Sequence, residues 1–203
     1  MTSGAPYGLD SIETIDGSSL VVRPIQPSDS EALDAAFHKL SAESRYRRFL
    51  HPVNHLARRD LEYLTCVDHV AHEALIALGP GGEIVAVARF IREDDRSERA
   101  EVAITVADSW QRRGVGTQIL QRLATRAGES GVEVFTAICL EDNEEMFDLF
   151  RELGATTTHR SAGTTDIEVE VALPADSPAH VLGAALKAAA ADEAQAPPLL
   201  TEP

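Results

Sequence analysis

Cysteine is scarce in this sequence, and long apolar runs are missing. Cys66 and Cys139 are the only cysteines and form no C-x-x-C pair, which excludes both a disulfide framework and a cysteine-rich zinc site. No apolar stretch reaches the roughly 20 residues that span a bilayer. Residues 1–10 also lack the basic segment and apolar run of a signal peptide. These absences predict a soluble, cytoplasmic protein.

Basic residues are also few: 18 against 33 acidic ones, which gives a formal net charge of −15. Nucleic acids and anionic membrane surfaces are bound through basic patches, so we expect neither as a partner. Local arginines can still form a pocket for a small anion. The 203 residues, 44% apolar and 25% charged, suffice for one globular domain that needs no disulfide or metal.

Composition divides the chain into three parts. Residues 1–18 are rich in Ser, Gly and Asp, which predicts a flexible leader. Residues 19–173 have the apolar patterning of a folded domain. From 174 to 203 Ala, Pro and acidic residues dominate, and residues 179–191 of this tail have the composition of a short helix.

Within the domain, strand and helix patterns alternate in a way that predicts a mixed α/β sheet. The segment 79–82, Gly-Pro-Gly-Gly, predicts a hairpin. The apolar run 132–140 is typical of a strand buried on both faces. Strands are expected at 19–25, 73–78, 84–91, 101–107, 132–140 and 165–173, and helices at 28–40, 41–49, 59–65, 116–130 and 143–153.

The segment from Glu101 to Leu120 is a strand that enters a glycine-containing loop, and this loop opens directly into a helix. A helix N-terminus offers unpaired N–H groups and the positive end of the dipole, so it suits a phosphate. A Walker loop would need a Lys-Ser/Thr pair after the second glycine, and a dinucleotide fingerprint would need a third glycine where Ile119 stands. A tight packing turn with no ligand is the remaining structural alternative.

The loop residues Gln-Arg-Arg-Gly-Val-Gly, 111–116, resemble the Q/R-x-x-G-x-G/A acyl-coenzyme-A signature of the GCN5-related N-acetyltransferase (GNAT) family. The segment 143–154 resembles the family in the same order, and the resemblance covers residues 20–173. It implies a mixed, mostly antiparallel central sheet flanked by helices. Residues 20–64 further resemble the acetyltransferase domain of bacterial protein lysine acetyltransferases, which implies that this chain is the catalytic domain alone.

The resemblance implies acetyl-CoA as the donor and coenzyme A as the product. Backbone amides of the loop would hold the pyrophosphate, Val106 would hydrogen-bond the pantetheine arm at a strand edge, and Asn143 would contact the cofactor at the start of the last core helix. The cofactor-binding residues implied in this way are Val106, Gln111, Arg112, Arg113, Gly114, Val115, Gly116, Thr117 and Asn143.

Glu101 matches the glutamate that acts as general base in the lysine acetyltransferase branch of the family. Because a lysine amine has a pKa of about 10.4, it must lose a proton before it can attack a thioester, and a carboxylate can take this proton directly or through a water. The alternative is a strand-edge carboxylate in a salt bridge. Phe150 stands where many family members have a tyrosine that protonates the leaving thiolate, so that step is either unassisted or served by another group.

Two other groups of residues weigh less. His69, His72 and Glu73 have a spacing that resembles part of a metal site, but such a pair at the start of a strand is more often a surface feature, and we expect no metal. Cys139 lies in a buried-strand pattern and is expected to be an inert core residue.

These observations predict an acetyl-CoA-dependent N-acetyltransferase whose acceptor is a protein lysine. Two alternatives stay open: a small-molecule amine N-acetyltransferase, favoured by a net charge of −15 that would attract cationic acceptors, and a non-catalytic acyl-CoA-binding regulatory module. The sequence names neither the acceptor, the acyl chain nor the oligomeric state.

Overall fold

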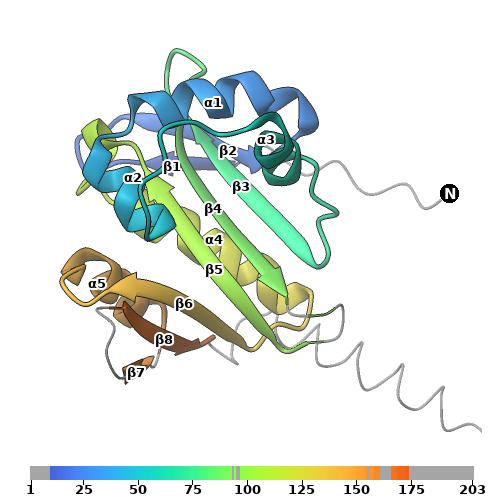
Figure 1. Ribbon diagram of the computed structural model, residues 1–203, viewed down its shortest axis with the longest axis vertical. Helices are drawn as coiled ribbons and strands as arrows, with labels where there is room; N and C mark the ends of the chain where they lie inside the picture. The colour runs from blue at the N-terminus through green and yellow to red at the C-terminus, as the bar shows by residue number, and fades with distance from the viewer. Residues whose placement is uncertain (1–9, 93, 95–96, 155, 161–165, 174–203) are drawn as a thin grey trace, which may run out of the picture.

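The structure is a computed structural model that describes residues 10–92, 94, 97–154, 156–160 and 166–173. Within these residues the strands form one sheet in the order β1-β2-β3-β4-β5-β6-β8-β7. All neighbouring strands are antiparallel except β5 and β6, which run parallel. Helices flank this sheet (Figure 1). The expected mixed, mostly antiparallel α/β fold is therefore confirmed.

Among the residues described, no helix is both long enough and apolar enough to cross a membrane.

The strands and helices alternate along the chain much as the sequence patterns indicate. The strands are β1 Asp10–Glu13, β2 Ser19–Pro24, β3 His72–Leu78, β4 Ile84–Arg92, β5 Arg99–Val106, β6 Val134–Leu140, β7 Thr156–Arg160 and β8 Asp166–Ala172; the α-helices are α1 Ser30–Lys39, α2 Ala42–Phe49, α3 Arg58–Thr65, α4 Val115–Glu129 and α5 Glu144–Leu153.

The sheet half made of β1 to β5 is covered on both faces. Helix α4 packs on one face, where its buried residues Ile119, Leu120 and Leu123 join the larger apolar core. Helices α1 and α3 lie over the other face, where Leu33 and Ile76 belong to a smaller apolar cluster (Figure 1). These two cores explain why β3 and β4 read as nearly continuous apolar runs.

In the part of the chain that the structure describes, the half made of β6, β8 and β7 is covered on one face only, apart from the contact between α2 and β6. Helix α5 packs on that face, where Phe150 and Leu153 join the larger core. The other face is open, and Ile138 of β6 is 54% exposed. The prediction that the run 132–140 is buried on both faces is therefore wrong, because periodicity cannot tell whether a helix covers the second face of a strand.

The ends of the domain differ from expectation. The leader prediction for residues 1–18 is wrong at residues 10–13, because β1 pairs with β2 and Ile12 is fully buried. Only one side chain of this short strand is buried, too weak a pattern to detect. Strand β7 was likewise not expected. Residues 1–9 and the tail 174–203, including the expected helix at 179–191, lie outside the described residues.

The first helix begins later than its sequence pattern indicates. A 3-10 turn covers Pro27–Asp29, and α1 begins at Ser30. Asp29 accepts two hydrogen bonds of 2.7 Å from the guanidinium of Arg23 and one from the backbone N–H of Gln26. The Arg23 guanidinium is the main cause that lowers the pKa of Asp29, although burial opposes it. This bidentate pair ties the end of β2 to the start of α1.

The two halves of the sheet are joined over a very short stretch. Parallel pairing between β5 and β6 covers only Arg99–Glu101 opposite Val134–Thr136. Beyond Glu101 the two strands diverge, β5 towards α2 and β6 towards α5 (Figure 1). Helix α2 packs against both β5 and β6 and so bridges the divergence. We call this junction between the halves the seam.

Candidate active site

A cleft of about 590 Å³ opens at the seam. Its walls come from α2, the end of β5, the loop into α4, and the first turns of α4 and α5. Both charge signs are present on these walls. The lining residues are Ser41, Glu43, Ser44, Arg47, Arg48, Ile104, Thr105, Val106, Asp108, Gln111, Arg112, Gly114, Gly116, Thr117, Asn143, Glu145, Met146, Asp148, Leu149 and Glu152.

The N-terminus of α4 forms one wall of this cleft. Its N-cap, Gly114, has φ +79°, a left-handed conformation that glycine adopts without steric cost. Because Gly114 has no side chain to cap the helix, the first-turn N–H groups keep their capacity for an external acceptor. A Cβ on Gly116 would lie 3.4 Å from the methyl carbons of Leu149 on α5. The glycines therefore leave the backbone accessible between two closely packed helices.

Asp108 fastens α2 to the loop that precedes α4. Its carboxylate accepts hydrogen bonds from the Ser41 N–H at 2.9 Å, the Ser41 hydroxyl at 2.7 Å and the Ser44 hydroxyl at 2.8 Å. Burial raises the pKa of Asp108, but these hydrogen bonds outweigh it and leave the pKa lowered. Gln111 donates to the Ser44 hydroxyl at 3.2 Å and to the Val106 carbonyl at 3.0 Å.

Sequence reasoning missed Asp108. The two serines have the spacing of a helix cap, and Ser41 does cap α2 by accepting from the Ser44 N–H. Nothing in the sequence indicates that a residue more than sixty positions away would bind both hydroxyls. Gln111, which was expected to bind the cofactor, donates its side-chain amide N–H groups to Ser44 and Val106 instead. Its side chain therefore holds the loop in place.

Asn143 and Thr117 lie on the opposite wall of the cleft. Asn143 is only 7% exposed, and its side chain caps α5 by accepting from the Met146 N–H at 3.3 Å. The Thr117 hydroxyl donates to Glu152 of α5 at 2.9 Å. The first turn of α4 is therefore fixed against the last turn of α5 beside the cleft.

Arg113 and Val115 do not line the cleft. The Arg113 guanidinium forms an ion pair with Asp16 at 3.0 Å and lies over the ring of Trp110, 5.0 Å from its centroid. Val115 is 1% exposed and belongs to the larger core. Because both side chains are engaged elsewhere, only the backbone N–H of either residue could contact a cofactor in the cleft.

Glu101 lies in the seam but outside the cleft. It lines a separate cavity of about 230 Å³ together with Thr136, Ile138 and Glu168. It is also the last residue of β5 that pairs with β6. Ile104, at the inner end of the cleft, follows three residues later, which is roughly 10 Å along a strand. Glu101 and the cleft therefore lie at different positions along β5, next to the point where the two strands diverge.

Arg48 of α2 connects these two regions. It lines the cleft, and the negative charge of Glu101 acts on its guanidinium. Burial is the larger influence and lowers the pKa of Arg48, while Glu101 partly offsets this. The sequence contains no signal for Arg48, because its role depends on where α2 packs.

The remaining candidate residues have structural partners. His69 Nδ1 lies 2.8 Å from Glu73, which also forms an ion pair with Arg126 at 2.7 Å. Cys139 is 1% exposed, and burial raises the pKa of its thiol to about 11, as expected of an inert core residue. Phe150 is fully buried in the larger core.

The fold and this cleft define the class of the protein. The mostly antiparallel sheet and the glycine loop that opens into a helix agree with the sequence prediction, and the structure adds the short parallel junction beside that helix N-terminus. The model of the acetyltransferase (GNAT) family matches residues 33–155, more than half of the chain. The chain belongs to this family.

Known relatives agree with this assignment. Acetyltransferase Pat of Mycolicibacterium smegmatis is 36% identical over 164 residues, which cover 79% of this chain and 48% of Pat. This chain thus spans about half the length of that relative. The GNAT domain of S. lividans PAT superposes with a TM-score of 0.75 at 32% identity, over 81% of this chain and 97% of that domain.

A more distant structure shares the fold alone. The ribosomal L7/L12 alpha-N-protein acetyltransferase RimL, solved in complex with coenzyme A, superposes with a TM-score of 0.64 at 17% identity. The match covers 81% of this chain and all of RimL.

Proposed function

We propose that this protein transfers an acetyl group from acetyl-CoA to the side-chain amine of a protein lysine. The observation that carries the proposal is the seam. The cleft with the glycine-capped helix contacts β5 at residues 104–106, and the cavity that contains Glu101 contacts it where the pairing with β6 ends. A thioester delivered through the cleft and an amine delivered through the cavity would meet between the diverging strands.

The residues on the cleft walls fit the donor. Backbone N–H groups from Arg112 to Thr117 would bind the pyrophosphate at the positive end of α4, a helix of 15 residues. The Arg112 side chain lines the cleft and adds positive charge. The edge of β5 at Val106 would hydrogen-bond the pantetheine arm, beside Asn143 on the opposite wall.

Glu101 would act as the general base. At neutral pH the acceptor is an ammonium that must lose a proton before its nitrogen attacks the thioester carbonyl. Because Glu101 lies roughly 10 Å along the strand from Ile104, we expect the proton to reach it through a water. Backbone N–H groups near Val106 would stabilise the oxyanion. Phe150 is buried and has no hydroxyl, so the thiolate, with a thiol pKa near 8.5, would leave without a tyrosine acid at that position.

The cavity beside Glu101 suits a lysine side chain. The exposed apolar Ile138 offers a surface for methylene groups. Glu101 and Glu168 offer two negative charges for the ammonium against the one positive charge of Arg92, which also lines the cavity. The net charge of −15 adds a long-range attraction for cationic acceptors of any size. The resemblance of residues 20–64 to the acetyltransferase domain of bacterial protein lysine acetyltransferases favours a protein lysine over a polyamine or another small amine.

The test is an acceptor screen with acetyl-CoA. The purified chain would be incubated with lysine peptides, polyamines and amino acids, and products would be identified by mass spectrometry. Acetylation of the lysine ε-amine in peptides supports the proposal. Exclusive modification of free small amines would replace it with the small-molecule alternative, and tight binding of acetyl-CoA without turnover of any amine would replace it with the regulatory module.

A further inference from the structure

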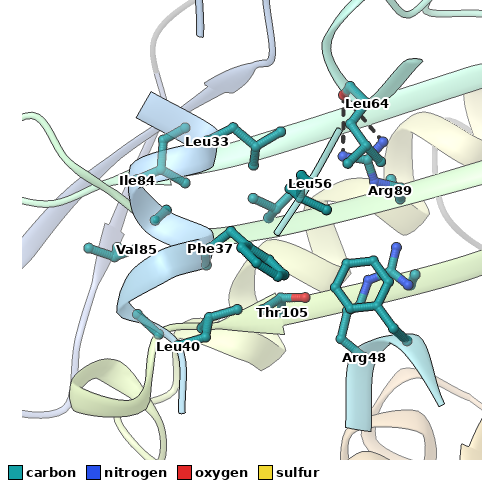
Figure 2. Close-up of a pocket in the computed structure, with 16 residues that line it drawn as sticks. Leu33, Phe37, Leu40, Arg48, Leu56, Leu64, Ile84, Val85, Arg89 and Thr105 are labelled. Carbon is teal, nitrogen blue, oxygen red and sulfur yellow. Dashed lines mark hydrogen bonds between the residues drawn. The ribbon is translucent and has the colours of Figure 1, made fainter. Parts of the chain in front are cut away.

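A small cavity lies beside the cleft, on the face of β4 and β5 that α1 and α3 cover. Its volume is about 60 Å³, and most of its walls are apolar. Figure 2 shows Leu33 and Phe37 of α1 on one side and Arg48, Arg89 and Thr105 towards the other. Arg48 and Thr105 also line the large cleft, so these two residues are the partition between the two spaces.

Two cations face this cavity. Arg89 is only 4% exposed and donates to the Leu64 carbonyl at 3.3 Å and to His72 Nε2 at 3.1 Å. Burial, followed by the positive charge of Arg48, lowers the pKa of Arg89 to about 9. Within the described part of the chain, no carboxylate lies within ion-pair distance of either guanidinium.

Arg89 is buried, and Arg48 is half-buried with its guanidinium 5.0 Å from the centroid of the Phe49 ring. Holding two like charges near each other and largely away from water without a counterion is costly, since each charge loses part of its hydration. A neutral carbonyl and a neutral imidazole offset part of this cost at Arg89, and the nearest acidic influence on Arg48, from Glu101, acts from beyond ion-pair distance. A carboxylate brought in by a ligand would supply the missing negative charge, and charge-assisted hydrogen bonds to guanidinium groups are strong.

The size of the cavity restricts that ligand. One water needs roughly 10–15 Å³ on this measure, so 60 Å³ holds about four atoms of similar size. A succinyl group exceeds an acetyl group by four heavy atoms, namely one methylene and one carboxylate. Apolar walls fit the methylene, and the two guanidiniums fit the carboxylate.

We propose that this cavity binds the free carboxylate of a short dicarboxylic acyl group, so that the protein accepts succinyl-CoA as a donor. The inference rests on the proposed acyltransferase function. In the transfer, the amine nitrogen bonds to the thioester carbonyl carbon, the C–S bond breaks, coenzyme A leaves as the thiolate, and the ammonium proton passes to the base. The distal carboxylate is unchanged and stays with Arg48 and Arg89.

The test compares donors with one lysine peptide as the acceptor. Butyryl-CoA has the same four-carbon chain without the carboxylate, and we expect kcat/KM for succinyl-CoA to exceed that for butyryl-CoA at least tenfold. Arg89→Met keeps the apolar bulk and removes the charge. It should lower kcat/KM for succinyl-CoA at least tenfold and leave that for acetyl-CoA within about twofold, because Arg89 does not line the cleft.

Two further variants keep the proposal testable if Arg89→Met does not fold. Arg89→Lys keeps a cation and should retain part of the preference for succinyl-CoA. Ala36→Leu fills the cavity from α1 and should lower succinyl transfer but not acetyl transfer. If succinyl-CoA is no better than butyryl-CoA while acetyl-CoA is used, the inference is wrong and the proposed function stands. If Arg89 instead controls the use of acceptors that carry a carboxylate, the assignment to the donor is overturned.

If no donor is turned over, the proposed function fails. The binding affinity for succinyl-CoA then tests whether the cavity holds the distal carboxylate. Calorimetry with succinyl-CoA should give tighter binding to the wild type than to Arg89→Met, with acetyl-CoA binding equal in both. Equal binding of succinyl-CoA to the two proteins would contradict it.

Discussion

One face of the sheet is covered by helices in one half and exposed in the other. On β3, β4 and the end of β5 it lies under α1 and α3, where Ile76 is fully buried. On β6, the same face continues from Glu101 across to Thr136, because these two residues pair in register. There, among the described residues, only α2 contacts β6 beside the seam, and Ile138 is 54% exposed.

The contrast shows why the site forms where it does. The covered half is a packed core, which fixes β5 and the helix that follows it. The open half is held by α5 from one face only, and it meets β5 over just Arg99–Glu101. Since pairing ends there, β5 presents an unpaired edge to the cleft. The cleft and the Glu101 cavity exist because the two halves do not close against each other.

The largest expected effect is at the seam itself. Glu101→Gln keeps the shape of the side chain and removes its basicity, so kcat should fall about a hundredfold at saturating acetyl-CoA, as is typical for loss of a positioned base. Acetyl-CoA affinity should hold, because Glu101 does not line the cleft. The measurement is the pH–rate profile of both proteins with a lysine peptide.

A carboxylate in this cavity can either accept the proton of the acceptor or attract its positive charge. Glu168→Gln, in the same cavity but on the open half, tests the second role alone. We expect it to raise KM for the cationic acceptor and to leave kcat within a few-fold. Near-normal kcat and an unchanged acidic limb in Glu101→Gln would remove Glu101 from the mechanism.

The second prediction concerns the glycine at the mouth of the cleft. Gly114 and Gly82 both have φ +79°, so an alanine at either position should cost about 1 kcal/mol of stability. Gly82 lies in the β3–β4 hairpin, outside the cleft. Calorimetry should show about tenfold weaker acetyl-CoA binding for Gly114→Ala and unchanged binding for Gly82→Ala. Equal losses in the two variants would mean that stability, not the loop, governs affinity.

A third prediction tests whether His72, in the covered half, is shielded from solvent, through the pH dependence of stability. Burial, followed by the positive charge of Arg89, lowers the pKa of His72 from 6.5 to about 4. The unfolded chain therefore binds a proton between these values that the folded chain does not, and stability is lost as the pH falls from 6.5 towards 4. After allowance for solvent screening, we expect about 1 kcal/mol between pH 7 and pH 5.

His72→Gln should remove that part of the pH dependence, because its amide oxygen can still accept from Arg89 and does not titrate. Urea unfolding of both proteins at pH 7 and pH 5 measures the difference. The same slope in the variant and the wild type would show that His72 is solvated.

The smallest effects come from a matched pair on the two halves of the same face. Ile76→Val removes a methylene from a fully buried side chain and should cost about 0.5–1.5 kcal/mol. Ile138→Val makes the same change at an exposed position and should cost less than about 0.3 kcal/mol. Urea midpoints compare them directly. A cost at Ile138 equal to that at Ile76 would indicate that something covers the open face in solution.

Local patterns in the sequence were enough to predict most elements. The helical spacing of Ile119, Leu120 and Leu123 predicts α4, and Gly79–Gly82 predicts the hairpin between β3 and β4. They were not enough for β1 and β7, where a few residues pair at the sheet edges without a strong apolar alternation. Nor could an apolar run show that β6 is open on one face, since the covering helix would come from elsewhere in the chain.

For the site, the sequence by itself determined the parts that are contiguous: the end of β5, the glycine loop and the start of α4. Their chemistry follows from backbone geometry, which neighbouring residues specify. Three features appear only in the folded chain: Asp108 binds Ser41 and Ser44, Arg113 pairs with Asp16, and Arg48 and Arg89 line one cavity. Each of them joins segments far apart in the chain, so its geometry depends on how those segments pack and not on neighbouring residues.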